Sequence, residues 1–215
     1  MDLRLLSVNV GMPREIGIVR GEPVLSGIAK TPVEEPSVYV NATNIEGDGQ
    51  ADLSVHGGVD KAVYCYPADH WPWWERENAF ACRPAAFGEN LTVEGADETE
   101  IGIGDRFRWG DVVLEVSQPR APCFKFAIIS RRPDAPALMT ASGRTGWYFR
   151  VIQNGHAGVG RNVLVREQAA GGPSVREAFF AAIHAHADKD LVRRVADAPA
   201  LAFSWRRTVE RRLRP

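Results

Sequence analysis

The sequence predicts a mainly β protein, a closed or nearly closed β-barrel with a few helices, followed by a small three-helix domain. Many short apolar segments rich in β-branched and aromatic residues recur along the first 168 residues, and glycine and proline separate them. A Gly-Gly-Pro break then precedes three short segments whose apolar residues recur at helical spacing. We therefore predict a barrel domain at residues 1–168 and a helical domain at residues 174–215.

Composition limits the classes of function. A chain of 215 residues is long enough to bury a large core, and 45% hydrophobic and 25% charged residues are ordinary for a soluble globular protein. The formal net charge of -1 argues against a surface devoted to nucleic acid or to an anionic membrane. Charges interrupt the segment Met1–Leu6, so the sequence predicts no signal peptide and no membrane helix, and we expect a cytoplasmic protein.

The predicted strands lie where β-branched and aromatic residues cluster between turn signals. They are Leu3–Val10, Val24–Ile28, Ser37–Val40, Ala62–Tyr66, a strand from Leu91, Ile101–Trp109, Val112–Val116, Trp147–Ile152 and Val163–Val165. Alternation along Trp147–Ile152 places Trp147, Phe149 and Val151 on one face and Tyr148 on the other. The segment His70–Glu77, with three tryptophans, predicts a helix in which core packing is favoured over cofactor stacking. Arg131–Pro136 and Gly143–Gly146 are predicted loops.

Three helices are predicted after the Gly-Gly-Pro break. Ser174–Glu177 is a capping box that starts the first, Lys189–Ala196 forms the second, and the third follows Pro199. From Ser174 to the C-terminus nine lysines and arginines face five acidic residues. This basic excess suits an acidic protein or a nucleic acid, although a solvated helix face is the usual explanation.

The cysteines point to a site rather than to a disulfide framework. Cys65, Cys82 and Cys123 are odd in number and widely spaced, which excludes a CxxC zinc pattern and fits a reducing compartment. Pro119 and Pro122 place Cys123 on a stiff, non-helical segment leaving a strand. A thiol beside Arg120 and Lys125 can be held as a thiolate that attacks electrophiles or binds a metal. A lone cysteine is more often a small buried hydrophobe, so both interpretations stay open from these residues alone.

A glycine-rich passage supplies a second candidate feature. His56 is followed by Gly57 and Gly58, and Lys61 comes soon after. Paired glycines let successive backbone amides form an anion-binding nest, and a lysine suits phosphate. Glycines that only satisfy a hairpin turn explain the same pattern. Neither GxxxxGK[ST] nor GxGxxG occurs here. Farther along, a turn explains Gly88 better than it explains the polar residues Glu89 and Asn90.

Five segments taken in order resemble the MOSC family, named for the C-terminal domain of molybdenum cofactor sulfurase, and its YiiM-like group with a three-helix tail. They are Lys30–Val33, Gly47–Asp52, His56–Ala62, Phe87–Leu91 and Gln118–Cys123. The resemblance runs from about Leu3 to the C-terminus. Gly160-Arg161 departs from it, because Gly-Asp is expected there.

The resemblance implies a β-barrel that binds the molybdenum cofactor, with Cys123 as a thiolate ligand of the metal. Molybdenum would take two sulfurs from the pterin dithiolene and a third from the cysteine, and would keep positions open for substrate. Asp60 and Glu89 are implied as pterin acceptors or proton handlers. The residues implied to bind the cofactor's phosphate and pterin are Lys30, His56, Gly57, Gly58, Lys61, Asn90 and Arg120.

The resemblance also implies an activity: reduction of N-hydroxylated compounds, such as hydroxylaminopurine-type bases and hydroxylamines, to amines. An external flavin or iron–sulfur protein would supply the electrons, because the chain has no motif for a second cofactor. One alternative is a non-catalytic cofactor or sulfur carrier that holds persulfide on Cys123. Another is a module that binds nucleic acid through its basic tail, which the near-neutral total charge disfavours. No membrane partner is expected.

Overall fold

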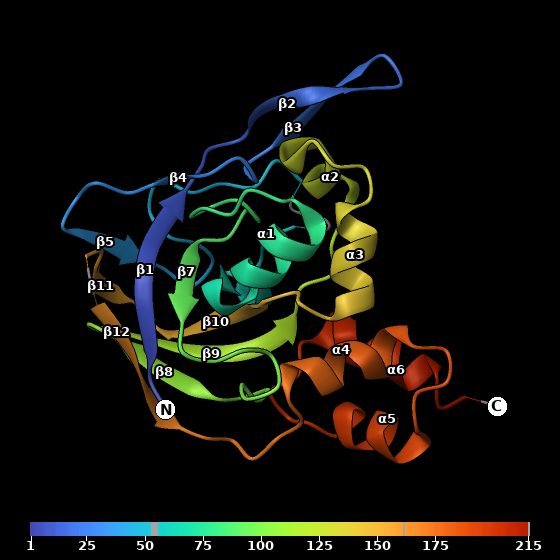
Figure 1. Ribbon diagram of the computed structural model, residues 1–215. Helices are drawn as coiled ribbons and strands as arrows, with labels where there is room; N and C mark the ends of the chain where they lie inside the picture. Colours follow the sequence, from blue (N-terminus) through green and yellow to red (C-terminus); the bar gives the residue numbers. More distant parts are fainter. Residues whose placement is uncertain (53–55, 161, 215) are drawn as a thin grey trace.

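The protein is a closed mixed β-barrel, described here from a computed structural model that covers residues 1–52, 56–160 and 162–214 (Figure 1). Seven strands follow one another in the order β12, β8, β9, β10, β6, β7, β1, and β12 pairs back with β1 to close the ring. Neighbours are antiparallel except β6 and β7, which are parallel. The predicted barrel is confirmed. The departure at Arg161 lies outside the described residues.

The strand bounds agree with most of the predicted segments. The strands are β1 (Leu3–Val10), β2 (Arg14–Val19), β3 (Glu22–Ser26), β4 (Thr31–Pro32), β5 (Ser37–Val40), β6 (Val63–Pro67), β7 (Leu91–Glu94), β8 (Arg106–Trp109), β9 (Val112–Pro119), β10 (Trp147–Gln153), β11 (Gly155–Gly158) and β12 (Asn162–Gln168).

Two strand predictions need correction. The predicted strand Ile101–Trp109 begins only at Arg106, because Asp105 accepts a hydrogen bond from the N–H of Gly102 at 2.7 Å and closes a turn instead. The segment Val24–Ile28 leaves its strand at Ser26. Its partner β2 was not predicted, because it is mostly exposed and lacks an alternating apolar face. The two form a separate hairpin that projects at the top of Figure 1.

Helices cover one side of the barrel. The predicted tryptophan-rich helix is α1 (Trp71–Asn78), and Trp74 packs in a buried aromatic cluster with Phe80, Phe87 and Phe126. Two short helices, α2 (Phe124–Ser130) and α3 (Ala135–Ser142), were not predicted. The predicted loop Arg131–Pro136 is wrong at its end, since Pro136 occupies the first turn of α3, where a missing N–H costs nothing.

The C-terminal segment forms α4 (Val175–Ile183), α5 (Lys189–Ala196) and α6 (Phe203–Arg211). The capping box is confirmed: the Ser174 hydroxyl accepts from the Glu177 N–H, and the Glu177 carboxylate accepts from the Ser174 N–H. These helices share one continuous apolar core with the barrel, and the N–H of Ala202 donates to the carbonyl of Ser117 on β9 at 2.9 Å. None of the described helices is long and apolar enough to cross a membrane.

Candidate functional site

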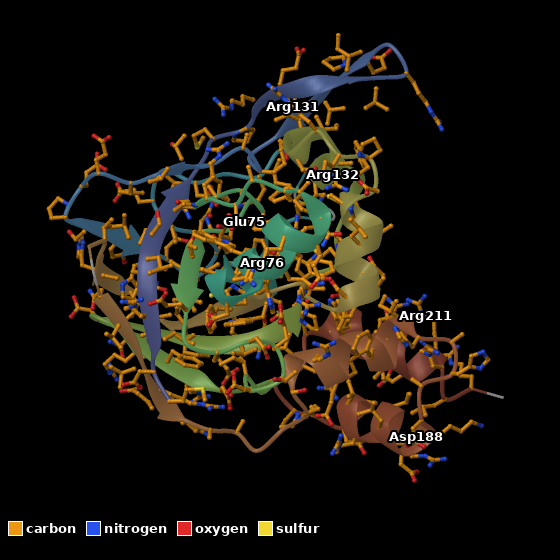
Figure 2. The ribbon with its side chains drawn as sticks, in the orientation of Figure 1. Glu75, Arg76, Arg131, Arg132, Asp188 and Arg211 are labelled. Carbon is orange, nitrogen blue, oxygen red and sulfur yellow. The ribbon has the colours of Figure 1, made fainter. Side chains whose placement is uncertain are left out.

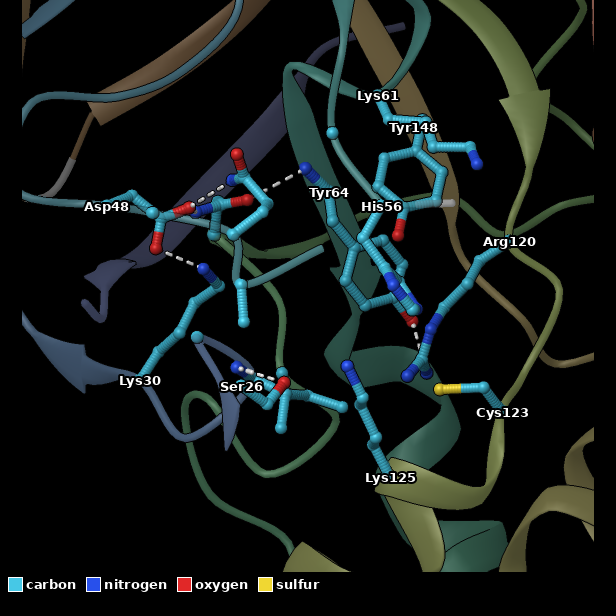
Figure 3. A pocket seen from close by; sticks show the side chains of 18 of the residues that line it. Ser26, Lys30, Asp48, His56, Lys61, Tyr64, Arg120, Cys123, Lys125 and Tyr148 are labelled. Atoms are coloured by element: carbon cyan, nitrogen blue, oxygen red, sulfur yellow. Dashed lines mark hydrogen bonds and ion pairs between the residues drawn. The ribbon is translucent and has the colours of Figure 1, made fainter. Parts of the chain in front are cut away.

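A cleft at one end of the barrel gathers residues that are far apart in the sequence (Figure 3). Its empty space, counted out to solvent, is about 670 Å³. It is lined by the end of β3, the segments around Asp48 and His56, strands β6 and β10, and the turn that leads from β9 into α2. The residues predicted for the site that line it are Lys30, His56, Gly57, Lys61, Asn90, Arg120 and Cys123.

Cys123 lies where β9 gives way to α2. The chain stays extended after Pro119, as predicted, and Cys123 is the residue preceding the helix, with φ −126° and ψ 169°. Its sulfur lines the cleft rather than the packed core. Burial raises the pKa of this thiol, but a hydrogen bond from His56, the charge of Arg120 and the N–H of Lys125 outweigh burial and bring the pKa to about 7. At neutral pH the thiolate fraction of this cysteine is therefore much larger than that of an ordinary cysteine.

Arg120 is a buried cation beside that sulfur. Only 4% of the residue is exposed, and no carboxylate among the described residues forms an ion pair with it. Its Nη1 donates to the hydroxyl of Tyr64 at 3.2 Å, and its guanidinium stacks over the rings of Tyr64 and Phe126. A buried charge is costly without a counter-charge, so this position fits a negatively charged ligand.

At the opposite end of the cleft the charged and polar side chains pair with one another. Lys30 forms an ion pair with Asp48, whose side chain is fully buried. Burial lowers the pKa of Lys30, and Asp48 opposes that effect. Asp48 also accepts from the N–H of Gly11 at 2.9 Å and from Asn90 Nδ2 at 2.9 Å. Asn90 is itself occupied, because its Oδ1 accepts from the N–H of Tyr64 at 3.0 Å. These side chains join β1, β6 and β7 to the loops that precede β4 and follow β5.

The His56 segment forms a third wall. The predicted glycines adopt the left-handed region, with φ 89° at Gly57 and φ 85° at Gly58. A Cβ on Gly57 would lie 3.0 Å from Gln50 Oε1, so this position needs glycine for conformation and for space. Gly58 leads into the one-turn helix η1 (Val59–Lys61) and lies outside the cleft wall. The Nδ1 atom of His56 is buried and has no hydrogen-bond partner among the described residues.

Two predicted residues lie behind the cleft walls. Asp60 Oδ1 accepts from Arg150 Nε at 2.9 Å and Nη2 at 2.7 Å, which anchors η1 to β10 and places the charge next to Lys61. Glu89 is fully buried and accepts from the N–H groups of Ala85 and Phe87, so it shapes the loop before β7. Burial raises the pKa of Glu89 to about 7, against the lowering effect of its hydrogen bonds.

Tyr64, Tyr148 and Asp48 line the cleft but were not predicted for the site, and Lys125 was named only as a neighbour of the Cys123 thiol. Tyr64 and Tyr148 face one another across β6 and β10, with ring centroids 5.2 Å apart. The alternation of residues along β10 places Tyr148 on the face opposite the core-facing Trp147. This alternation was the one sequence signal that could have identified Tyr148 as a cleft residue. Nothing in the sequence shows that Asp48, in a segment rich in turn residues, is buried.

Comparison with known proteins decides the family. The MOSC domain model matches residues 52–164, and the YiiM-like, 3-alpha helix domain matches residues 173–214. The chain belongs to the MOSC family. This MOSC protein is 42% identical over 207 residues to YflK of Bacillus subtilis, covering 94% of this chain and 90% of YflK. The crystal structure of YiiM from Geobacillus stearothermophilus has a TM-score of 0.81 at 32% identity, covering 99% of this chain and 100% of that one.

A fungal protein adds a functional name. This MOSC protein is 37% identical over 168 residues to a protein of Gibberella moniliformis named "Reductase". The match covers 76% of this chain and 29% of the fungal protein. The shared segment is thus a minor part of a longer chain.

The cleft fits the cofactor associated with MOSC domains. Among the described residues, Cys123 offers a soft thiolate donor, the buried Arg120 has no carboxylate partner, and His56 Nδ1 has no hydrogen-bond partner. This combination suits a ligand with metal, anionic and polar groups. Lys61 and Lys125 add positive charge to the same walls.

Proposed function

We propose that this MOSC protein is a molybdenum-cofactor-binding oxidoreductase that reduces N-hydroxylated compounds to amines. One observation carries the proposal: a thiol with a pKa of about 7 opens into a cleft beside a buried arginine that has no carboxylate partner among the described residues. Family membership and the similarity to a fungal protein named "Reductase" support it. Hydroxylaminopurine-type bases and hydroxylamines are the proposed substrates, and a reducing cytoplasm is the proposed setting.

In this proposal different residues of the cleft bind different parts of the cofactor. The Cys123 sulfur would hold the metal, and Arg120 would keep that sulfur ionised. Lys61 and Lys125 would face the phosphate, while the Lys30–Asp48 pair and Asn90 would fix the surrounding loops. When bound, the cofactor would supply the two-electron step that accepts the substrate oxygen.

The reaction consumes two electrons and two protons for each N–OH group: the N–O bond breaks, an N–H bond forms, and the oxygen leaves as water. Tyr148 is the proposed source of one proton within the cleft. Burial raises the pKa of its phenol, so the group remains protonated at neutral pH, and Arg120 lies beside it. The electrons and the second proton would enter from outside the chain.

The test is to purify the protein, measure molybdenum and pterin on the same sample, and assay a panel of N-hydroxylated purines and amidoximes with a chemical electron donor. Stoichiometric metal with amine formation supports the proposal. Metal-free protein that carries labile sulfur on Cys123 would instead support the sulfur carrier, for which the same thiolate would serve. Stoichiometric cofactor with no reduction of any substrate would favour a cofactor carrier.

A further inference from the structure

We propose that the rim of the cleft is the docking surface for an acidic flavoprotein domain that delivers the electrons. This inference rests on the proposed function and names the partner that it requires. The rim comprises the β2–β3 hairpin with the two residues before it, η1, the start of α2 and the residue that follows α2. Its defining side chains are Met12, Leu25, Val59, Phe124, Lys125 and Arg131.

Large apolar side chains stand exposed around the opening. The exposed fractions are 63% for Met12, 55% for Leu25, 59% for Val59 and 55% for Phe124. Three of them adjoin residues of the cleft wall: Phe124 follows Cys123, Leu25 precedes Ser26, and Met12 Sδ lies 3.2 Å from where a Cβ on Gly49 would be. Val59 shares the one-turn helix η1 with Lys61, which lines the cleft. Exposed apolar residues that gather around a cleft mark a site of interaction.

The hairpin and α2 form one side of this rim. They are in contact, and a Cβ on Gly17 of β2 would lie 3.2 Å from Ile128 of α2. Figure 1 shows the hairpin lying beside α2 at the same end of the molecule. A partner seated here would therefore contact both elements at once and would cover the mouth of the cleft.

The charge on this side favours an acidic partner. From Arg120 to Arg132 the chain carries four basic residues and no acidic one. Arg120 is buried in the cleft and Arg132 pairs with Asp134, which leaves Lys125 next to Phe124 and Arg131 at the other end of α2. The hairpin is balanced, because two arginines offset Glu15 and Glu22. A positive patch of this kind steers and orients a negatively charged partner.

Electron count selects the kind of partner. Each N–O bond cleaved consumes two electrons, and one reduced flavin carries two, whereas one iron–sulfur cluster delivers them singly. Phe124, next in sequence to Cys123, would bring the partner's flavin close to the metal-binding sulfur. We therefore assign the rim to a flavodoxin-like domain with acidic residues around its flavin.

The test uses the cofactor-loaded protein and a reduced FMN-containing flavodoxin as the probe. Phe124→Glu and Arg131→Glu are compared with Phe203→Glu and Arg211→Glu. Phe124 and Phe203 are the first residues of α2 and α6, and both are exposed. Figure 2 places Arg131 and Arg211 at separate ends of the molecule. The rim variants should weaken flavodoxin affinity about tenfold or more, while the α6 variants stay near wild type.

Several results would overturn the assignment. Unchanged affinity in both rim variants, or affinity of the wild type that does not fall as salt rises, would remove the docking surface. Tight rim-dependent binding of a [2Fe–2S] ferredoxin without binding of flavodoxin would replace the flavin domain. A dimer that Phe124→Glu dissociates would make the rim a self-interface, and rim-dependent vesicle binding would make it a membrane contact.

Turnover with a chemical reductant separates this inference from the proposed function. The rim variants should keep wild-type turnover with that donor, because it enters the cleft without docking. If the wild-type protein does not reduce N-hydroxylated substrates with the chemical donor, the proposed function itself is wrong.

Discussion

The two ends of the cleft use similar side chains for opposite purposes. At one end Lys30 and Asp48 neutralise each other, and Asp48 accepts further hydrogen bonds from Gly11 and Asn90. At the other end Arg120 is equally buried but faces only tyrosines, an aromatic ring, a sulfur and the Cys123 thiol. Removing one partner of the Lys30–Asp48 pair would leave a buried charge uncompensated, whereas Arg120, whose only anionic neighbour among the described residues is the Cys123 thiolate, can take a further anionic ligand. The difference separates the charged side chains that stabilise the fold from those that are available to bind a ligand.

The largest expected effect is at the open end. Cys123→Ala should reduce N-hydroxyl reduction to the background rate while leaving the free energy of unfolding nearly unchanged, because the sulfur belongs to the cleft. Cys82→Ala is the matched control: that thiol is also half-buried, burial raises its pKa to about 12, and it lies outside the cleft. Steady-state assays with a chemical donor check this. Full activity of Cys123→Ala would remove the thiolate from the mechanism.

The closed end should respond in stability. Asp48→Asn leaves Lys30 buried without its counter-charge and should cost about 3–5 kcal/mol of unfolding free energy at pH 7. Because the pKa of Lys30 is already lowered and would fall further, the folded state would bind fewer protons than the unfolded state. Stability of the variant should thus recover as pH rises toward the ordinary lysine pKa of 10.5.

Denaturant unfolding of Asp48→Asn at pH 7 and pH 9.5 measures both effects. The double variant Lys30→Met, Asp48→Asn is the control, and it should regain much of the loss. Equal unfolding free energies for wild type and Asp48→Asn at pH 7 would mean that the pair does not hold the loops.

Substitution of Glu89, which lies just before β7 and near the Lys30–Asp48 pair, should change the unfolding free energy by an intermediate amount. Burial raises its pKa to about 7 from an ordinary value of 4.5. The folded state then binds the proton more tightly, so this group stabilises fully below pH 4.5, and its contribution is lost as pH rises through about 7. In the wild type, Glu89 should lower the unfolding free energy by a few kcal/mol between pH 5 and pH 7.5. In Glu89→Gln this contribution to the pH dependence should be absent. Parallel curves for variant and wild type would contradict the raised pKa.

The smallest loss of stability is expected from Arg120→Met. Replacing a buried cation that has no carboxylate partner among the described residues with an apolar side chain should leave the unfolding free energy of cofactor-free protein unchanged or raise it by about 1–4 kcal/mol. Chemistry should change more. Alkylation of Cys123 by iodoacetamide should rise with pH through about 7 in the wild type and only at higher pH in the variant, because Arg120 holds the thiol pKa down. A large loss of stability without a shift in alkylation would make Arg120 a structural residue.

The sequence predicted the barrel and the order of the cleft segments because strands with apolar alternation and proline stops leave local signals. It did not reveal α2 and α3, since each is short, packs on the aromatic cluster and has no side-chain hydrogen bond at its N-cap. It brought Lys30 and Arg120 into one site through a family resemblance, but it could not show that a buried Asp48 neutralises the first and not the second. That distinction depends on contacts between segments distant in the chain.

X-ray absorption at the molybdenum edge, on purified wild type and Cys123→Ala, tests the central claim most directly. The account predicts molybdenum in the wild type with one more sulfur ligand than any molybdenum retained by the variant. Molybdenum with the same number of sulfur ligands in both proteins would contradict it.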